Sequence, residues 1–76
     1  MRTTKEIYVD YYNVTALKQR LREEEIRVEQ TIQEKLSSGH RADKELERLL
    51  EIDKEYQDAC NRYVEIVDEL MEVVES

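Results

Sequence analysis

The sequence contains no proline, tryptophan or phenylalanine, and only one glycine, one cysteine and one histidine in 76 residues. Because proline interrupts helices most strongly, nothing in the chain forbids helix from end to end. A single cysteine excludes an internal disulfide framework. No apolar run approaches the roughly 18 residues of a membrane-spanning helix, and no signal-peptide core follows the first residues. We therefore expect a cytoplasmic protein that does not enter membranes.

Charged side chains are abundant, at 41% of the residues, with 19 acidic against 12 basic groups and a net charge of −7. This balance argues against direct nucleic-acid binding, which needs a basic surface. Hydrophobic residues still make up 39%, more than is typical of a disordered chain. We expect one small all-α domain covering residues 1–76.

The helical pattern is broken only at residues 37–40, which read Ser-Ser-Gly-His. Glycine readily adopts the left-handed conformation that ends a helix, and the serines compete for backbone hydrogen bonds. The sequence therefore predicts helices over about residues 4–37 and 41–75, joined by a turn at 38–40.

Two starting points are open for the first helix. Thr3 and Glu6 match a capping box, in which each side chain accepts a hydrogen bond from the other residue's backbone. A later start, at Asn13 or Thr15, is the alternative because residues 7–12 are rich in β-branched and aromatic side chains. We favour the earlier start.

Both segments carry apolar side chains at helical spacing. The first has one stripe, Ile7, Tyr11, Val14, Leu17, Leu21, Glu25, Val28, Ile32 and Leu36. The second has two tracks whose members are spaced seven residues apart. One track is Leu46, Asp53, Cys60, Val67 and Val74, and the other is Ala42, Leu49, Tyr56, Tyr63 and Leu70. Together they predict a heptad seam. A short connection makes the helices antiparallel in a coiled-coil-like hairpin, with Tyr11 opposite Val67 and Ile7 opposite Met71.

The apolar surface exceeds what one seam buries, especially at the tyrosine-rich end that holds both termini. The residues expected there at an interface are Ile7, Tyr8, Tyr11, Tyr12, Tyr63, Val64, Ile66, Val67, Leu70, Met71 and Val74. Two arrangements would cover them: two hairpins forming a homodimeric four-helix bundle, or one hairpin bound to a larger protein. The preferred function is thus a non-catalytic, regulatory protein–protein interaction module.

Two acidic residues interrupt the apolar pattern. Glu25 and Asp53 fall opposite each other when the chain is folded about Gly39, which predicts a polar layer in the core that sets the register. A carboxylate metal site is the alternative, but diiron bundles use a Glu-x-x-His motif on inward-facing positions and the only histidine, His40, follows the turn glycine. We predict no metal and no cofactor.

The sequence offers no catalytic residues. Cys60 lies on an apolar track, where free cysteine usually packs as a small hydrophobic group, and no histidine is placed to activate it. Because no nucleophile–base set or phosphate-binding loop is present, we expect that the protein is not an enzyme.

The net negative charge comes entirely from the second half of the chain. Residues 1–37 are neutral overall, residues 38–76 carry the whole net charge, and no basic residue follows Arg62. An acidic ridge is predicted there from Glu65, Asp68, Glu69 and Glu72. The main alternative function is therefore an acidic inhibitor, or nucleic-acid mimic, that blocks a basic site on a partner protein.

Residues 43–50, Asp-Lys-Glu-Leu-Glu-Arg-Leu-Leu, resemble the start of the second helix in the small Spo0E-like aspartyl-phosphate phosphatases. Members of that family are helical hairpins in which a Ser-Gln-Glu-Leu-Asp signature acts on a phosphorylated response regulator. Only Glu45 and Leu46 of the signature are retained here. The resemblance implies a phosphatase-like regulator as a third alternative, and its activity is not carried over.

Overall fold

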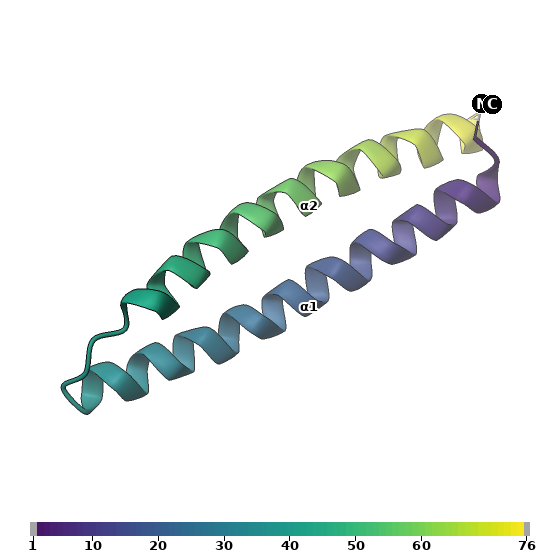
Figure 1. The fold of residues 1–76 in the computed structure, drawn as a ribbon. Coiled ribbons are helices and arrows are strands. Elements are labelled where there is room, and N and C mark those ends of the chain that lie inside the picture. The colour runs from purple at the N-terminus through teal and green to yellow at the C-terminus, as the bar shows by residue number, and fades with distance from the viewer. Residues whose placement is uncertain (1, 76) are drawn as a thin grey trace.

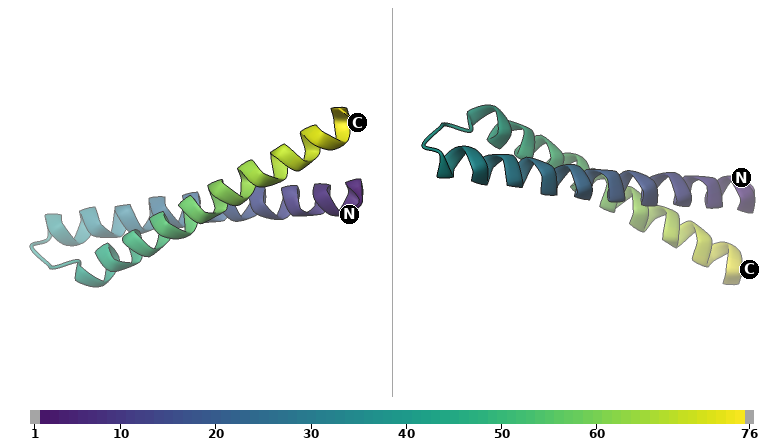
Figure 2. Two further views of the ribbon diagram at one scale, coloured as in Figure 1. Left: turned by 90° about the horizontal axis from the view of Figure 1, so that it is seen from above. Right: turned by 90° about the horizontal axis from the view of Figure 1, so that it is seen from below.

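The chain forms two long helices in a computed structural model that describes residues 2–75. Helix α1 spans Thr4–Ser37 and helix α2 spans Asp43–Glu75, and they run antiparallel with the termini together at one end (Figure 1). The hairpin is elongated, with Cα extents of 59 × 15 × 14 Å. Views from above and below show the helices crossing each other (Figure 2). The predicted all-helical hairpin is confirmed, and its assembly into a four-helix bundle stays a prediction.

The predicted capping box is present at the start of α1. Thr3 Oγ1 accepts a hydrogen bond from the Glu6 backbone amide at 3.2 Å, and the Glu6 carboxylate accepts one from the Thr3 backbone amide at 3.4 Å. Because these bonds occupy two amides that would otherwise lack partners, the helix begins at Thr4 and continues through the β-branched residues that follow.

The turn contains a Schellman motif. The His40 amide donates to the Lys35 carbonyl at 2.8 Å, and the Gly39 amide donates to the Leu36 carbonyl at 3.1 Å. Gly39 has φ = 78°, and a Cβ there would have nothing within 4 Å, so backbone conformation alone demands glycine. Helix α2 begins at Asp43, two residues later than predicted.

Two clusters make up most of the core between the helices, and Ile32 and Ala42 are also buried. Ile7, Val14 and Ile66 form one, near the termini, and Leu21, Ile52 and Ala59 form the other. Ile52 and Ile66 have no exposed surface. Among residues 2–75 every buried side chain is apolar, so desolvation of apolar groups holds the hairpin together.

The buried track of α2 differs from the predicted one. Ile52, Ala59 and Ile66 lie in the core, each one residue before a member of the predicted Asp53–Cys60–Val67 track. Tyr56, Tyr63 and Leu70, from the other predicted track, do pack against the core. Because one of the two predicted tracks stays in the contact, the helix is rotated by about 50°, half of one residue's turn, from the expected orientation. This rotation keeps Asp53 in water, where a carboxylate costs least.

The register differs as well. Tyr11 packs against Tyr63, with ring centroids 5.5 Å apart, and not against Val67 one turn later. Ile7 packs against Ile66, while Met71, its predicted partner, is exposed. The new pairing joins the isoleucines that fill the seam and leaves the flanking apolar residues of α2 outside it.

Candidate interaction surface

One edge of α2 is tied to α1 by ion pairs. Arg48, Arg62 and Glu69 occupy the same position of the heptad repeat and so line one edge of the helix. Arg48 contacts Glu24 at 2.7 Å, Arg62 contacts Asp10 at 3.3 Å, and Glu69 accepts from Arg2 at 2.9 Å. Lys35 and Glu45 form a fourth pair beside the turn. We call this side the ion-paired face: Arg2, Asp10, Glu24, Lys35, Glu45, Arg48, Arg62 and Glu69.

Three members of these pairs, Arg2, Arg48 and Glu45, have shifted pKa values. Hydrogen bonds to Asp10 and then Glu69 raise the pKa of Arg2, and hydrogen bonds to Glu24 and Glu51 raise the pKa of Arg48. The hydrogen bond from Lys35 is the largest cause that lowers the pKa of Glu45. The other Glu45 oxygen, Oε2, is buried without a hydrogen-bond partner. The ion pairs thus favour the charged forms of Arg2, Arg48 and Glu45.

The opposite edge of α2 carries a band of side chains at heptad spacing that is separate from the buried core residues. We call this band the apolar stripe. Its nine positions alternate steps of four and three residues: Leu46, Leu50, Asp53, Gln57, Cys60, Val64, Val67, Met71 and Val74. Seven of these are apolar, and two, Asp53 and Gln57, are polar. Leu50 is 72% exposed, Val64 58%, Met71 55% and Val74 79%. A heptad spacing of this kind is what a helix uses to pack against another helix, and α1 leaves seven of the nine positions exposed.

The stripe is hollowed near the termini. Val67, Leu70, Met71 and Val74 line a shallow apolar depression of about 200 Å³ that ends at Glu75. Tyr8 and Tyr12 of α1 are also exposed at this end of the hairpin. The surface therefore offers an apolar, aromatic-flanked site without convergent polar groups.

The predicted interface residues divide into two groups. Five of them serve the hairpin itself: Ile7 and Ile66 are buried, and Tyr11, Tyr63 and Leu70 pack against them. The other six stay outside: Tyr8, Tyr12, Val64, Met71 and Val74 are exposed and Val67 is half-buried. The set predicted as one interface thus mixes the core with the surface.

A cluster of tyrosines and basic side chains lies within the helix contact. The Tyr11 and Tyr63 hydroxyls are 3.4 Å apart, and this hydrogen bond is the largest cause that raises the pKa of Tyr11. Lys18 Nζ lies 4.3 Å from the Tyr63 ring centroid and 5.8 Å from that of Tyr56. Arg22 also lies over Tyr56. Sequence reasoning missed these cation–π contacts because they follow only from the register.

The predicted polar layer lies at the rim of the helix contact. Asp53 is exposed and Glu25 is half-buried, and both line one surface hollow with Glu29, Leu49 and Leu50. In residues 2–75, no group of three potential metal ligands comes together. The two carboxylates line one surface hollow, whereas the sequence predicted that they form a polar layer inside the core.

The acidic ridge is partly neutralised within the hairpin. Glu69 is bound by Arg2, and Glu65 pairs with Arg62 at 3.4 Å. Asp68 and Glu72 are exposed on the same side of α2. Two of the four predicted carboxylates are thus already matched by arginines of the same chain.

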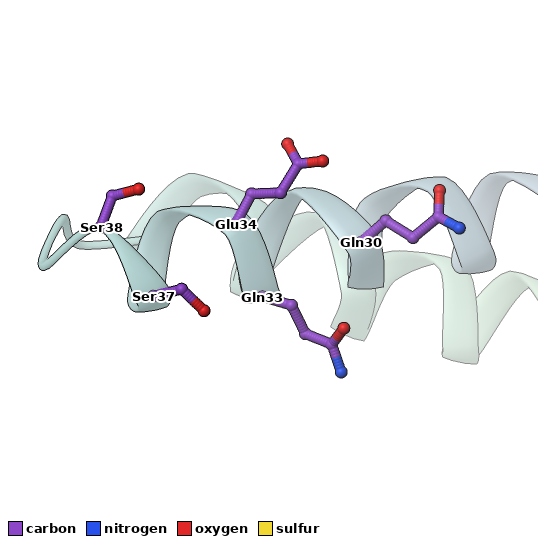
Figure 3. Close-up of a pocket in the computed structure, with 5 residues that line it drawn as sticks. All are labelled: Gln30, Gln33, Glu34, Ser37 and Ser38. Carbon is purple, nitrogen blue, oxygen red and sulfur yellow. The ribbon is translucent and has the colours of Figure 1, made fainter.

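A further hollow near the turn is polar and open. Its lining residues are Gln30, Gln33, Glu34, Ser37 and Ser38. Figure 3 shows that the Ser37 and Gln33 side chains point to one side, while Ser38 and Glu34 point to the other. Because its polar groups diverge, this hollow has none of the convergence that a small-molecule site requires.

Comparisons with known proteins return nothing for this chain: no protein-family model matches it, and neither a curated protein nor a solved structure shows detectable similarity. Within residues 2–75, no helix has the length and hydropathy to cross a bilayer.

Proposed function

We propose that this protein is a non-catalytic interaction module that binds a helix of another polypeptide along the apolar stripe of α2. One observation carries the proposal. Helix α2 has two bands of apolar side chains at heptad spacing, the buried band and the apolar stripe, and the hairpin core uses only the buried band. An exposed apolar surface that repeats every seven residues marks a site for packing against a further helix.

The ion-paired face supports this proposal by contrast. There the interhelical arginine–carboxylate pairs already engage the charged groups that border the seam. The apolar stripe has no such partner from α1, although removing its leucine, valine and methionine side chains from water would be favourable by about 1.5–3 kcal/mol for each one fully buried. Binding through the stripe is therefore the more favourable use of the free surface.

The acidic-inhibitor alternative has less support. Arg2 and Arg62 bind two of the ridge carboxylates, which leaves Asp68 and Glu72 to attract a basic partner. The phosphatase-like alternative would rely on Glu45, which is held by Lys35 in an ion pair. Both alternatives place the working residues outside the stripe, so they predict that changes to the stripe leave function intact.

Site-specific photo-crosslinking in the cells that make the protein tests the proposal. Benzoylphenylalanine replaces Val64 on the stripe or, as a matched control, Val9, which is 57% exposed against 58% for Val64. Val9 lies two residues after the buried Ile7, about 200° around the helix, and so faces away from α2. We expect a discrete protein adduct from the Val64 position alone, abolished by adding Met71→Lys.

Two results would contradict the proposal. The first is the absence of any protein adduct at Val64, and the second is an equal yield from the Val64 and Val9 positions. Strong salt dependence of the adduct together with loss on Asp68→Asn and Glu72→Gln would favour the acidic-inhibitor alternative.

A further inference from the structure

A track of exposed, mostly charged residues borders the apolar stripe on the side away from α1. Its members repeat every seven residues, and we call them the flanking track: Glu47, Lys54, Asn61, Asp68 and Glu75. Asp68, for example, follows Val64 of the stripe by four residues and precedes Met71 by three. In helices that pack by heptads, charges at such border positions select the partner helix and its direction.

The charges of the flanking track are not neutralised within the hairpin. None of its four charged side chains forms an ion pair within residues 2–75. Three of the four are acidic, and Lys54 is the basic member. On the ion-paired face, by contrast, Arg48 and Arg62 are matched by carboxylates of α1. The flanking track therefore presents a net negative charge to any helix that covers the stripe.

Two hollows along the stripe combine apolar walls with carboxylates. The one nearer the turn has a volume of about 290 Å³, and its lining residues are Glu25, Glu29, Leu49, Leu50 and Asp53. The depression near the termini ends at Glu75. None of these four carboxylates is ion-paired in the described part of the chain. Lysine and arginine side chains complement such hollows, because an aliphatic stem packs on apolar surface while the cationic head pairs with a carboxylate.

Two basic side chains of α1 lie over tyrosine rings next to the stripe. Lys18 Nζ is 4.3 Å from the Tyr63 ring centroid, and the Arg22 guanidinium carbon is 5.8 Å from that of Tyr56. Neither Lys18 nor Arg22 forms an ion pair with a carboxylate of residues 2–75. The acidic groups around the stripe thus keep their capacity to pair with cations from outside the hairpin.

A second copy of this chain fits these charges poorly. Parallel packing of two stripes sets each charged member of the flanking track beside its own equivalent. Antiparallel packing that pairs Lys54 with Asp68 sets Glu47 against Glu75, and it buries Asp53 against valines of the other stripe. Like-charge contacts and a buried carboxylate without a partner both oppose association.

We infer that the helix bound on the apolar stripe belongs to a different polypeptide and carries lysine or arginine beside its apolar positions. This inference rests on the proposed function and specifies the chemistry of its partner. Basic residues opposite Asp68 and Glu75 pair with the flanking track, and one in the hollow near the turn reaches Asp53, so that this carboxylate is not buried alone. The partner segment is therefore an amphipathic helix with a net positive charge.

Selection from a displayed peptide library tests the inference. The peptides have leucine at positions a and d of four heptads, and positions e and g vary among lysine, glutamine and glutamate. The full chain is the target, in about 150 mM salt, which screens long-range attraction between exposed charges. We expect lysine to be enriched about fivefold over glutamate among the binders. Val64→Glu should abolish binding of the selected peptides, while Val9→Glu should leave it unchanged.

Charge-reversal variants separate the flanking track from the overall charge of the protein. Asp68→Lys/Glu75→Lys should shift the selection toward glutamate. Asp58→Lys/Glu72→Lys is the matched control, because it changes the net charge equally at two exposed positions that lie farther around α2 from the stripe. This control should still select lysine. An equal shift in both double variants would overturn the inference, and so would a selection without lysine enrichment or without binders that depend on Val64.

Sedimentation equilibrium of the chain alone, between about 10 and 200 µM, tests whether the partner is a different polypeptide. We expect a monomer, because both ways of pairing two stripes bring like charges together. A dimer that Val64→Glu dissociates would show that a second copy occupies the stripe and would overturn the inference. The cellular adduct at Val64 decides the proposed function separately: an adduct without lysine enrichment leaves the interaction module standing and removes its basic partner.

Discussion

The two edges of α2 belong to one heptad repeat and have opposite chemistry. On the ion-paired face, Arg48 and Arg62 reach across to carboxylates of α1. On the apolar stripe, Leu50 and Val64 reach no partner and remain exposed. The fully buried Ile52 and Ile66 lie between the two edges. In this comparison, ion pairs join the helices along one side of the hairpin, and the other side exposes apolar side chains.

The physical reason lies in what each kind of group loses by staying in water. Exposed ion pairs contribute little stability, about 0–1 kcal/mol each, but they impose direction and register. Exposed leucine and valine contribute to stability only when they are covered. A charged edge is therefore complete in a single hairpin, whereas an apolar edge is complete only in an assembly.

The largest expected loss of stability comes from the buried isoleucines that lie between the two edges of α2. Ile66→Ala should lower the free energy of unfolding by about 2–5 kcal/mol, because it leaves a cavity where no surface is exposed. Val64→Ala, two residues earlier on the stripe, should cost less than about 0.5 kcal/mol in dilute protein. Urea denaturation followed by circular dichroism measures both. Equal losses of stability in the two variants would contradict the assignment of Ile66 to the core and Val64 to the surface.

The next largest loss of stability is expected at the turn between the two helices. Gly39→Ala should cost about 1 kcal/mol, because alanine is strained at φ = 78° although space for its Cβ is free. Gly39→Asn should cost less, since asparagine tolerates the left-handed region. Thermal unfolding of the two variants at matched concentration gives the comparison. A neutral Gly39→Ala would mean that the Schellman motif does not constrain the hairpin.

A smaller effect is expected from breaking the ion-paired face. Arg48→Met removes contacts with Glu24, Glu51 and Glu55 and should cost about 0.5–1 kcal/mol at low salt. The cost should shrink near 1 M salt, where exposed charges are screened. Denaturation at the two salt concentrations checks this result. A salt-independent loss would assign the role of Arg48 to packing of its aliphatic stem instead.

The smallest effect concerns pH. Lys35 lowers the pKa of Glu45 below its ordinary value of 4.5, so the stabilisation is complete above that pH and is lost as the pH falls through the lower, folded-state value. Glu45→Gln should therefore flatten the decline of stability below about pH 4.5. Unfolding curves between pH 2.5 and 7 measure the difference between the two proteins, with Glu47→Gln, on an exposed residue, as the control. If the stabilities of Glu45→Gln and the unmodified protein depended on pH in the same way, the contribution assigned to the Lys35–Glu45 pair would be wrong.

Much of the fold was predictable because its signals are local. The capping box needs only Thr3 and Glu6, and the turn needs a glycine that can adopt positive φ. Both helix periods were visible in the spacing of apolar residues. The expectation of an interface, with a second copy or with a larger protein, came from the surplus of apolar residues over what one seam can bury, and it stays a prediction.

The division of those apolar residues between core and surface was not predictable in the same way. On α2 the Ile52–Ala59–Ile66 track and the Asp53–Cys60–Val67 track differ by one residue, and each has apolar neighbours at heptad spacing. Sequence reasoning placed the second track inside and assigned Glu25 and Asp53 to the core. The structure places the isoleucines inside and keeps Asp53 exposed.

The sequence by itself determined that this chain is helical, where it turns, and that its negative charge and surplus apolar surface belong to the second helix. Those properties depend on neighbours a few residues apart. Only the tertiary structure decided which apolar track faces α1, because that choice depends on how isoleucine, tyrosine and arginine side chains of two helices fit at once. In this orientation Tyr11 packs against Tyr63 and Arg48 pairs with Glu24, and most of the apolar stripe stays exposed.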